Sequence, residues 1–313
     1  MNKEDDIRLD QKVRAAWMYY IAGLNQSEIA SQLGTSRPVV QRLIAAAKDE
    51  GIVSIGLHHP VANCLDYAQL LKEKYQLTDC NIVPVYSIES TLDSVTFGCY
   101  QLMARYLQGD KPTIVGIGSG LTLKKTIKRI DFDSQNTRCV ALISAMNEHG
   151  QCNYYDDVPL LLARKIQGKY YQWPAPRYAQ SREEYQMWST NRLFRNVSTV
   201  ARESDVIFVG IGALGRQSPI FKDGFIDEQQ LEELTARGGV GEILGRFIDA
   251  EGNVVESQIN QMITSHDIRE SNCPRIAAAC GEDKRPAILA ALKGGWINGL
   301  VTDEHTARWL LTR

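Results

Sequence analysis

The chain has 313 residues, and at about 100 to 200 residues per domain this length predicts two domains, or one large domain with a small appendage. Hydrophobic residues make up 44% of the sequence and charged residues 23%, a balance that excludes a wholly disordered chain. The formal net charge of -2 excludes a protein that is basic throughout, so any contact with nucleic acid must come from a local patch.

The sequence contains no signal for a membrane or for export. No uninterrupted apolar run of about 18 residues is present, and residues 1–10 are acidic, so we expect neither a membrane span nor a secretory signal. The seven cysteines are an odd number with no Cys-x-x-Cys pair, which is typical of neither a disulfide framework nor a zinc site. These features indicate a protein of the reducing cytoplasm.

The first predicted elements in chain order are three helices. Residues 12–22 form the first helix, because apolar residues recur there at helical spacing, and Gly23 follows in the position of a helix C-terminus. A second helix is expected after Asn25 and a third after Ser36, since both residues are good N-caps. The apolar residues of the first helix are Val13, Trp17, Tyr20 and Ile21.

The second and third helices have the spacing of a helix-turn-helix motif. Counted from Gln26, a small residue, Ala30, stands fifth and a glycine, Gly34, stands ninth. Ala30 allows the two helices to cross closely, and Gly34 permits the turn between them. Val40 and Leu43 then pack the third helix against the second. Because several unlike constraints agree, the pattern favours a DNA-binding motif over a helical hairpin of another kind with a solvated basic face.

Charge and polarity predict how this motif contacts DNA. Residues 12–48 contain five basic residues and one acidic residue, a local charge of +4. The first turns of the second helix of such a motif enter the major groove, so Arg37, Gln41 and Arg42 are the candidates for contact with base edges. Thr35 and Ser36 directly precede that helix and are expected at phosphate groups.

A linker near residues 58–60 is the predicted domain boundary. It separates a DNA-binding domain over residues 1–57, whose last six residues alternate like a strand, from a second domain over residues 58–313. No cysteine or acid stands at metal-binding spacing from His58 and His59, so both are expected to be exposed linker residues.

The second domain alternates short apolar strands with helices. Such alternation predicts an α/β fold, doubly wound, with a mainly parallel sheet that helices cover on both faces. The predicted strands are residues 81–85, 113–117, 138–143, 206–211, 275–279 and 299–302, and the predicted helices are residues 65–76, 92–107, 121–130, 284–292 and 305–311.

Ligands of such sheets bind beyond the carboxyl ends of the strands, so the residues that directly follow each strand are candidates. The sequence GSGLT follows residue 117 and opens a helix, where backbone N–H groups can hold a phosphate; the alternative is a plain tight turn. Lys284 opens a further helix, and Asp303 is either a ligand or the N-cap of the last helix. The candidate ligands in GSGLT are Ser119, Gly120 and Thr122.

Two segments contain acids of interest. Glu242 is the one acid in the glycine-rich residues 238–245, and it either binds sugar hydroxyls or lies at the surface beside a turn. A polar loop collects further possible metal ligands, but nothing sets their spacing for a tetrahedral site, so we expect no metal and no cofactor. The loop residues are His149, Cys152, Asp156 and Asp157.

The combined motifs resemble one family. A helix-turn-helix joined to an α/β domain with GSGLT, GGVGEILGRFIDAEG, GEDK and KGGWINGLVTDEHTA is similar to the SorC family of bacterial sugar-responsive transcription regulators. The resemblance extends from about Lys12 to the C-terminus. It implies the fold of sugar-phosphate isomerases used as a sensor, a tetrameric assembly, and a phosphorylated sugar or sugar alcohol as the effector.

The resemblance also implies roles for single residues. It places the phosphate loop on Ser119, Gly120 and Thr122, the basic anchor on Lys284 and the sugar-contacting acid on Glu242. The family commonly has aspartate at the last position and a glycine pair where this chain has residues 144–147, so we expect the pocket to differ at both places. Asn147 and Asn153 are weaker candidates for sugar contacts.

These observations predict a cytoplasmic regulator of a carbohydrate-metabolism operon. It would bind operator DNA as a homo-oligomer, a dimer or a tetramer, under the control of a sugar or sugar-phosphate effector. The alternative is a sugar-phosphate isomerase or deaminase with an added DNA-binding domain, for which Glu242 is the only good candidate base. A structural nucleoid protein is disfavoured by the near-neutral total charge.

Overall fold

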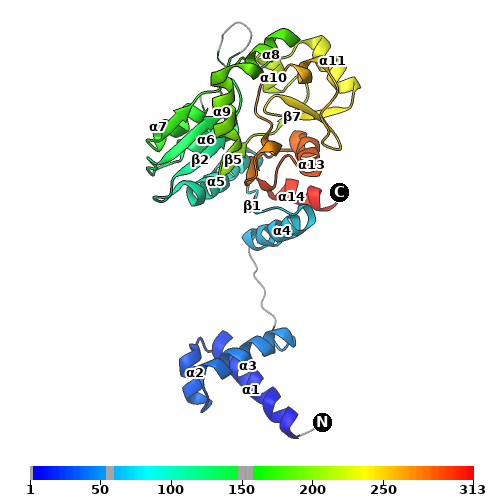
Figure 1. Ribbon diagram of the computed structural model, residues 1–313. Helices are drawn as coiled ribbons and strands as arrows, with labels where there is room; N and C mark the ends of the chain where they lie inside the picture. Colours follow the sequence, from blue (N-terminus) through cyan, green and yellow to red (C-terminus); the bar gives the residue numbers. More distant parts are fainter. Residues whose placement is uncertain (1–2, 54–59, 147–151, 153–157) are drawn as a thin grey trace. The chain divides into compact units, whose positions relative to one another are not determined.

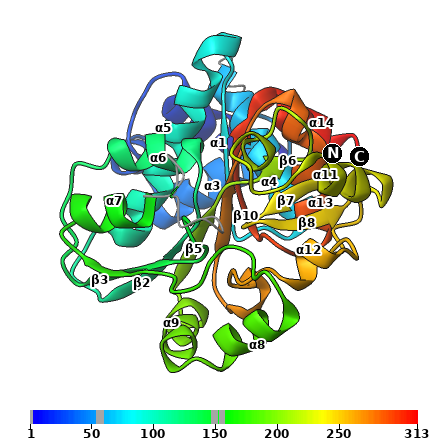
Figure 2. The same cartoon turned by 90° about the horizontal axis from the view of Figure 1, so that it is seen from above.

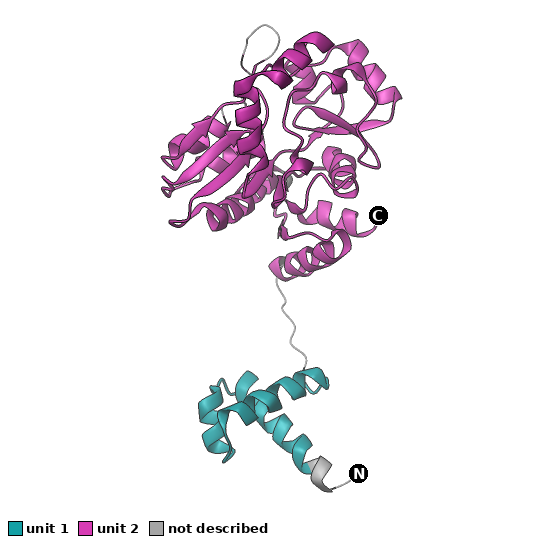
Figure 3. Cartoon of the chain, viewed as in Figure 1, with its two compact units in different colours: residues 1–59 teal, residues 60–313 magenta. Residues whose placement is uncertain are grey.

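The chain forms two compact units in the computed structural model, which describes residues 3–53, 60–146, 152 and 158–313. The N-terminal unit is Met1–His59 and the C-terminal unit is Pro60–Arg313 (Figure 3). The sequence predicts the boundary after residue 57, and the contacts of the structure divide the chain two residues later. No helix among the described residues is long and apolar enough to cross a membrane.

Three helices make up the described part of the N-terminal unit: α1 (Lys3–Tyr20), α2 (Gln26–Gln32) and α3 (Arg37–Asp49) (Figure 1). Asn25 caps α2 in a capping box, since its side chain accepts the N–H of Glu28 at 3.1 Å and the Glu28 carboxylate accepts the N–H of Asn25 at 2.7 Å. Gly34 has φ +63° in the turn between α2 and α3, a value that favours glycine. The buried core residues are Ala15, Ile29, Ala30, Val40 and Ile44.

The first helix differs from the sequence-based expectation. It begins at Lys3 instead of residue 12, and most of its apolar stripe faces outward: Trp17 and Ile21 are exposed, whereas Ala15 and Ala16 are buried. Small alanine side chains let α1 lie close against α3, so the larger side chains remain on the other face. The strand expected over residues 52–57 is not found at residues 52 and 53, and residues 54–57 lie outside the described ranges.

A seven-stranded sheet forms the centre of the C-terminal unit. All its paired neighbours are parallel, in the order β1-β10-β9-β5-β2-β3-β4. The strands are β1 (Asp79–Val83), β2 (Thr113–Ile117), β3 (Thr137–Ala141), β4 (Lys169–Tyr171), β5 (Val206–Val209), β9 (Arg275–Ala278) and β10 (Gly299–Asp303).

Helices cover both faces of this sheet, each over its own hydrophobic core (Figure 2). One face packs against α5 (Ile88–Leu107), α6 (Leu121–Lys128) and α7 (Val158–Lys165). The other packs against α4 (Pro60–Tyr75), α9 (Arg192–Arg202), α13 (Arg285–Lys293) and α14 (Glu304–Leu311). The predicted doubly wound α/β fold is therefore confirmed.

Several elements of the structure were not predicted from the sequence, among them short or glycine-rich strands and four helices of eight to eleven residues. The glycine-rich residues 238–245 belong to a small antiparallel sheet in the order β6-β7-β8. The missed elements, besides β4, α7 and α9, are β6 (Gly212–Ala213), β7 (Gly239–Ile243), β8 (Arg246–Asp249), α8 (Arg182–Thr190), α10 (Pro219–Lys222), α11 (Glu228–Ala236), α12 (Gln258–Gln261) and two 3₁₀ turns, Ile268–Glu270 and Glu282–Lys284.

The strand order sets the place for a ligand. From β2 the chain continues outward to β3 and β4, and then returns to β5 on the other side of β2. Loops that leave β2 and β5 therefore diverge to opposite sides of the sheet. The position between β2 and β5, where the strand order changes direction, is called the topological switch point. At such a point a crevice opens beyond the carboxyl ends of the strands.

Candidate functional site

A cavity of about 870 Å³ lies at this switch point. Its walls come from the segments that follow β2, β5 and β9, and from the hairpin of β7 and β8. Ligand pockets for small molecules commonly measure roughly 300 to 1,000 Å³. Five of the six predicted effector residues line it: Ser119, Gly120, Thr122, Glu242 and Lys284.

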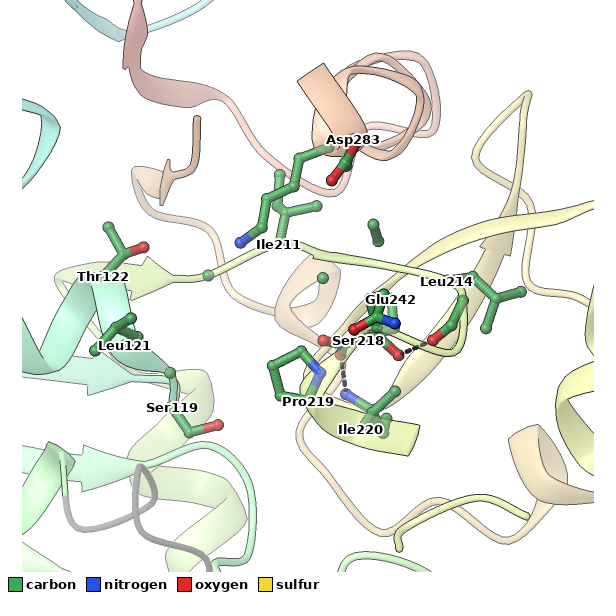
Figure 4. Close-up of a pocket in the computed structure, with 18 of the residues that line it drawn as sticks. Ser119, Leu121, Thr122, Ile211, Leu214, Ser218, Pro219, Ile220, Glu242 and Asp283 are labelled. Carbon is green, nitrogen blue, oxygen red and sulfur yellow. Dashed lines mark hydrogen bonds between the residues drawn. The ribbon is translucent and has the colours of Figure 1, made fainter. Parts of the chain in front are cut away.

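The loop after β2 forms the first wall. Gly120 is the N-cap of α6 with φ +115°, and no side chain caps the helix there. The first N–H groups of α6 consequently lack a side-chain capping partner, and the helix dipole adds partial positive charge at this end. Ser119 and Thr122 lie across the cavity from Glu242 and Ser218 (Figure 4).

Glu242 on β7 is held by the hairpin that it belongs to. Its Oε2 accepts the N–H of Gly245 at 2.7 Å, and its carboxylate lies against Gly212, where any Cβ would overlap it. Burial raises the pKa of Glu242, while the Gly245 N–H and the positive charges of Arg177 and Lys284 act in the opposite direction. The carboxyl group is therefore placed to exchange hydrogen bonds with a ligand in the cavity.

Lys284 provides a positive charge in the same cavity, from the segment that follows β9. It is the N-cap residue of α13, and its side chain lines the cavity. Burial lowers the pKa of Lys284, and the nearby Cys280 and Glu242 oppose that shift. Among the described residues no carboxylate lies within ion-pair distance of its Nζ. A buried cation without an ion-pair partner favours the binding of an anion.

The sequence reasoning missed Arg177, a second cation of the cavity wall. Its guanidinium donates to the carbonyl of Ser144 at 3.2 and 3.4 Å and stacks on Phe225 at 3.6 Å from the ring centroid. Arg177 lies six residues beyond the end of β4, so the rule of residues directly after a strand does not reach it, and β4 itself has only three residues and was not predicted. Ser144 stands where the family resemblance leads one to expect glycine, but the bond to Arg177 uses its backbone carbonyl, which any residue at this position would provide.

Asp303 occupies a different place from the effector site predicted for it. It does not line the cavity and is 3% exposed. Its carboxylate accepts the N–H of Thr306 at 2.9 Å, the hydroxyl of Thr306 at 2.7 Å and the N–H of Gly281 at 3.3 Å. These bonds make it the N-cap of α14, the alternative that the sequence had left open.

Several other candidates cannot be placed. Residues 147, 149, 153, 156 and 157 lie outside the described ranges, as do His58 and His59. Cys152 is described and exposed. Within the described part of the chain, no group of three His, Cys, Asp or Glu residues could hold a metal ion.

The candidate DNA-binding residues lie at the start of α3. Arg37, Gln41 and Arg42 are exposed, and Arg37 Nε donates to Gln26 Oε1 at 3.4 Å. Ser36 is the exposed N-cap of α3 and makes no capping bond with its side chain, while Thr35 is half-buried. The hydroxyl of Ser36 is thus available to a phosphate group.

Two of the five basic residues in the +4 segment are neutralised locally. Lys12 pairs with Glu50 at the end of α3, and Arg14 pairs with Asp10 at 2.6 Å. Arg42 makes no ion pair with any residue that the structure describes. The positive charge that a DNA backbone would meet is therefore concentrated on α3.

Comparison with known proteins adds the identity of the group. The family model named Sugar-bind, a sugar-binding domain, matches residues 59–312. The chain is 30% identical to the erythritol catabolism regulatory protein EryD of Brucella abortus (strain 2308) over 302 residues, which are 96% of this chain and 95% of that protein. It is 31% identical to the transcriptional regulator LsrR of Escherichia coli (strain K12) over 313 aligned positions, covering 96% of this chain and 94% of LsrR.

A solved structure agrees over both units. The full-length sorbitol operon regulator SorC from Klebsiella pneumoniae matches 98% of this chain and 99% of its own with a TM-score of 0.72 and 26% identity. A helix-turn-helix unit joined to a parallel α/β unit with a cavity at its strand ends defines a class, the ligand-responsive transcription regulators. Within that class the chain belongs to the SorC family of sugar-binding transcriptional regulators, as the sequence resemblance implies.

The relatives also decide between regulator and enzyme. EryD, LsrR and SorC are regulators and not enzymes, which confirms the expectation that this protein is not an enzyme.

Proposed function

We propose that the protein binds operator DNA of a carbohydrate-metabolism operon in the cytoplasm and that a phosphorylated sugar or sugar alcohol in the C-terminal cavity controls this binding. The observation that carries the proposal is the convergence of Lys284, the N-terminus of α6 and Glu242 on one cavity. A buried cation and a helix N-terminus are suited to a phosphate, and a carboxyl group is suited to hydroxyl groups.

The charges of the cavity support this ligand chemistry. Lys284 acts on Glu242 through space, and burial inclines that carboxyl group toward its neutral form. A phosphate group would give Lys284 a charged partner, whereas an uncharged sugar would leave it without one among the described residues. Two relatives are named for polyols, erythritol and sorbitol, which favours a sugar alcohol as the carbon skeleton.

The N-terminal unit would read the operator through α3. Arg37, Gln41 and Arg42 would contact base edges, and Thr35 and Ser36 would contact phosphates. A homo-oligomer, dimer or tetramer, would present two such helices to a palindromic site. The effector can change operator affinity only if it prefers one of two arrangements of the oligomer, a coupling typically worth about 1 to 3 kcal/mol.

A thermal-shift screen of the purified full-length chain tests the effector proposal. The panel contains sugars, sugar alcohols and the phosphate esters of both, because a ligand that binds the native state stabilises it by mass action. We expect stabilisation by a phosphate ester and none by its parent alcohol. The shift should be lost in Thr122→Val, which removes a hydroxyl at nearly constant volume, and kept in Thr190→Val. A clear response to an unphosphorylated compound alone would overturn the phosphate assignment.

A further inference from the structure

An apolar row runs along the outer surface of α1 in the N-terminal unit. Leu9, Val13, Trp17 and Ile21 follow one another at intervals of four residues and are 44%, 45%, 57% and 72% exposed. Ile21 continues the helical turn, because its N–H donates to the carbonyl of Trp17 at 2.9 Å. We refer to these four residues as the α1 ridge. Large contiguous apolar patches are rare on isolated soluble domains and mark contact sites.

The helix that carries the ridge is only partly supported by its own unit. The core contacts of α1 come from its C-terminal half, through Ala15, Met18 and Tyr20. Its N-terminal half extends beyond α2 and α3 (Figure 1). Because an unpacked helix of this length is only marginally stable in water, a partner along the ridge would stabilise α1.

We propose that the α1 ridge binds the same ridge of a second copy of this chain. Side chains four residues apart form a continuous row, and two such rows interlock at a crossing angle of about -50°, the commonest helix packing in globular proteins. A contact of a surface with itself generates a closed two-fold dimer. The neighbouring charges permit this approach, since Asp10 and Arg14 beside the ridge neutralise each other in an ion pair at 2.6 Å.

The contact would set the spacing of the two DNA-reading helices. Lys12 on α1 pairs with Glu50 next to the end of α3, and Ala15 shares a buried core with Val40 of α3. The helices α1 and α3 are thus joined at both places, and an α1 pair would hold two copies of α3 at one separation. A dimer of such motifs reads half-sites about 34 Å apart, so a fixed separation of the two α3 helices matters for DNA binding. Only this statement about spacing rests on the proposed function; the α1 pair itself does not.

Disulfide cross-linking of the full-length chain tests the α1 pair without DNA or sugar. Val13→Cys is placed on the ridge and Gln11→Cys on an exposed position of the same helix outside it, both in a Cys152→Ser background because Cys152 is the exposed native thiol. We expect Val13→Cys to form the covalent dimer about tenfold faster or more, because the interface raises the effective concentration of the two thiols. Mass spectrometry should locate the bond between the two engineered cysteines.

A charge on the ridge provides the decisive control. Trp17→Glu added to Val13→Cys should reduce the cross-linking rate to that of Gln11→Cys, and any fall of the thermal midpoint should accompany this loss of the pair, since Trp17 is exposed within its unit. Equal rates for Val13→Cys and Gln11→Cys would overturn the proposal. A lower midpoint with an unchanged rate would also overturn it, because the ridge would then pack against its own chain. Neither result bears on operator binding, so the proposed function is tested separately.

Discussion

The two units differ in how their candidate ligand-binding residues are arranged, on an exposed surface in one and around a cavity in the other. In the N-terminal unit the candidate contact residues, Thr35 to Arg42, lie within one turn and one helix and are mostly exposed. In the C-terminal unit, Ser119, Glu242 and Lys284 are brought together from three distant segments around a cavity. A duplex is read by side chains that project from a surface, whereas a small ligand must be enclosed by walls from several elements.

This difference teaches where each unit is sensitive to change. A substitution on an exposed helix such as α3 removes the contacts of that side chain and little else, as long as the core of the N-terminal unit still holds the helix in position. An enclosed pocket couples its residues electrostatically: Arg177 and Lys284 lower the pKa of Glu242, and Glu242 raises the pKa of Lys284. Substitutions in the C-terminal unit should therefore affect ligand affinity and pH dependence together.

The largest effect is expected from Lys284→Met. The substitution keeps most of the apolar stem and removes the cation, so the effector should bind about 2 kcal/mol more weakly, about thirtyfold in affinity. Calorimetric titration with the ligand from the thermal-shift screen measures this. Lys293→Met is the matched control on the same helix, because Lys293 pairs with Glu251 outside the cavity. Equal losses in both variants would show that the cation of the cavity has no special role.

Arg37→Ala should have the next largest effect, on sequence discrimination by the N-terminal unit. Loss of a contact to a base edge costs about 1 to 3 kcal/mol of discrimination. Gel-shift titrations on operator and random duplexes give the ratio of affinities. Lys48→Ala, at the other end of α3, should weaken binding to both duplexes alike. If Arg37→Ala also weakened both equally, its base-reading role would be wrong.

Substitution of one helix-capping residue in each unit would show whether the two units unfold independently. Asn25 caps α2 and Asp227 caps α11, each in a complete capping box. Replacing either by alanine should lower the free energy of unfolding by about 1 kcal/mol. Scanning calorimetry should assign Asn25→Ala to the N-terminal unit and Asp227→Ala to the C-terminal unit as separate transitions. A shared shift of one transition would mean that the two units unfold cooperatively.

The smallest effect concerns pH. Burial raises the pKa of Glu242 above 4.5. Between pH 4.5 and the raised pKa, the native protein without effector therefore keeps a proton on Glu242 that the unfolded chain releases. The free energy of unfolding should accordingly fall as the pH rises from 4.5 through the raised pKa. Urea titrations between pH 4.5 and about pH 7 should show that Glu242→Gln lacks this part of the slope, whereas the exposed Glu89→Gln keeps it. Parallel slopes for Glu242→Gln and the unaltered protein would contradict the assignment.

Much of the site could be predicted because its residues follow strands. Ser119 and Gly120 stand two and three residues after a predicted strand, and Lys284 opens the helix that follows another; parallel strands bring their carboxyl ends to one edge of the sheet. The same rule misplaced Asp303, since a residue at a strand end can equally cap the next helix. Arg177 was missed because it lies in a loop six residues beyond the three-residue strand β4, and only the fold brings that loop to the cavity.

The sequence by itself determined the elements with a local cause. Helix caps, the turn at Gly34, the alternation of strands and helices, and the charge of residues 12–48 all depend on neighbours in the chain. Only the tertiary structure decided which side of a helix is covered and which loops meet. The stripe of Val13, Trp17 and Ile21 faces outward because Ala15 and Ala16 are the buried side of α1. Glu242 lines the cavity because it pairs across β6 and β7 with Gly212, where a Cβ would overlap the carboxylate. Both outcomes depend on packing between segments that are distant in sequence, which no local pattern records.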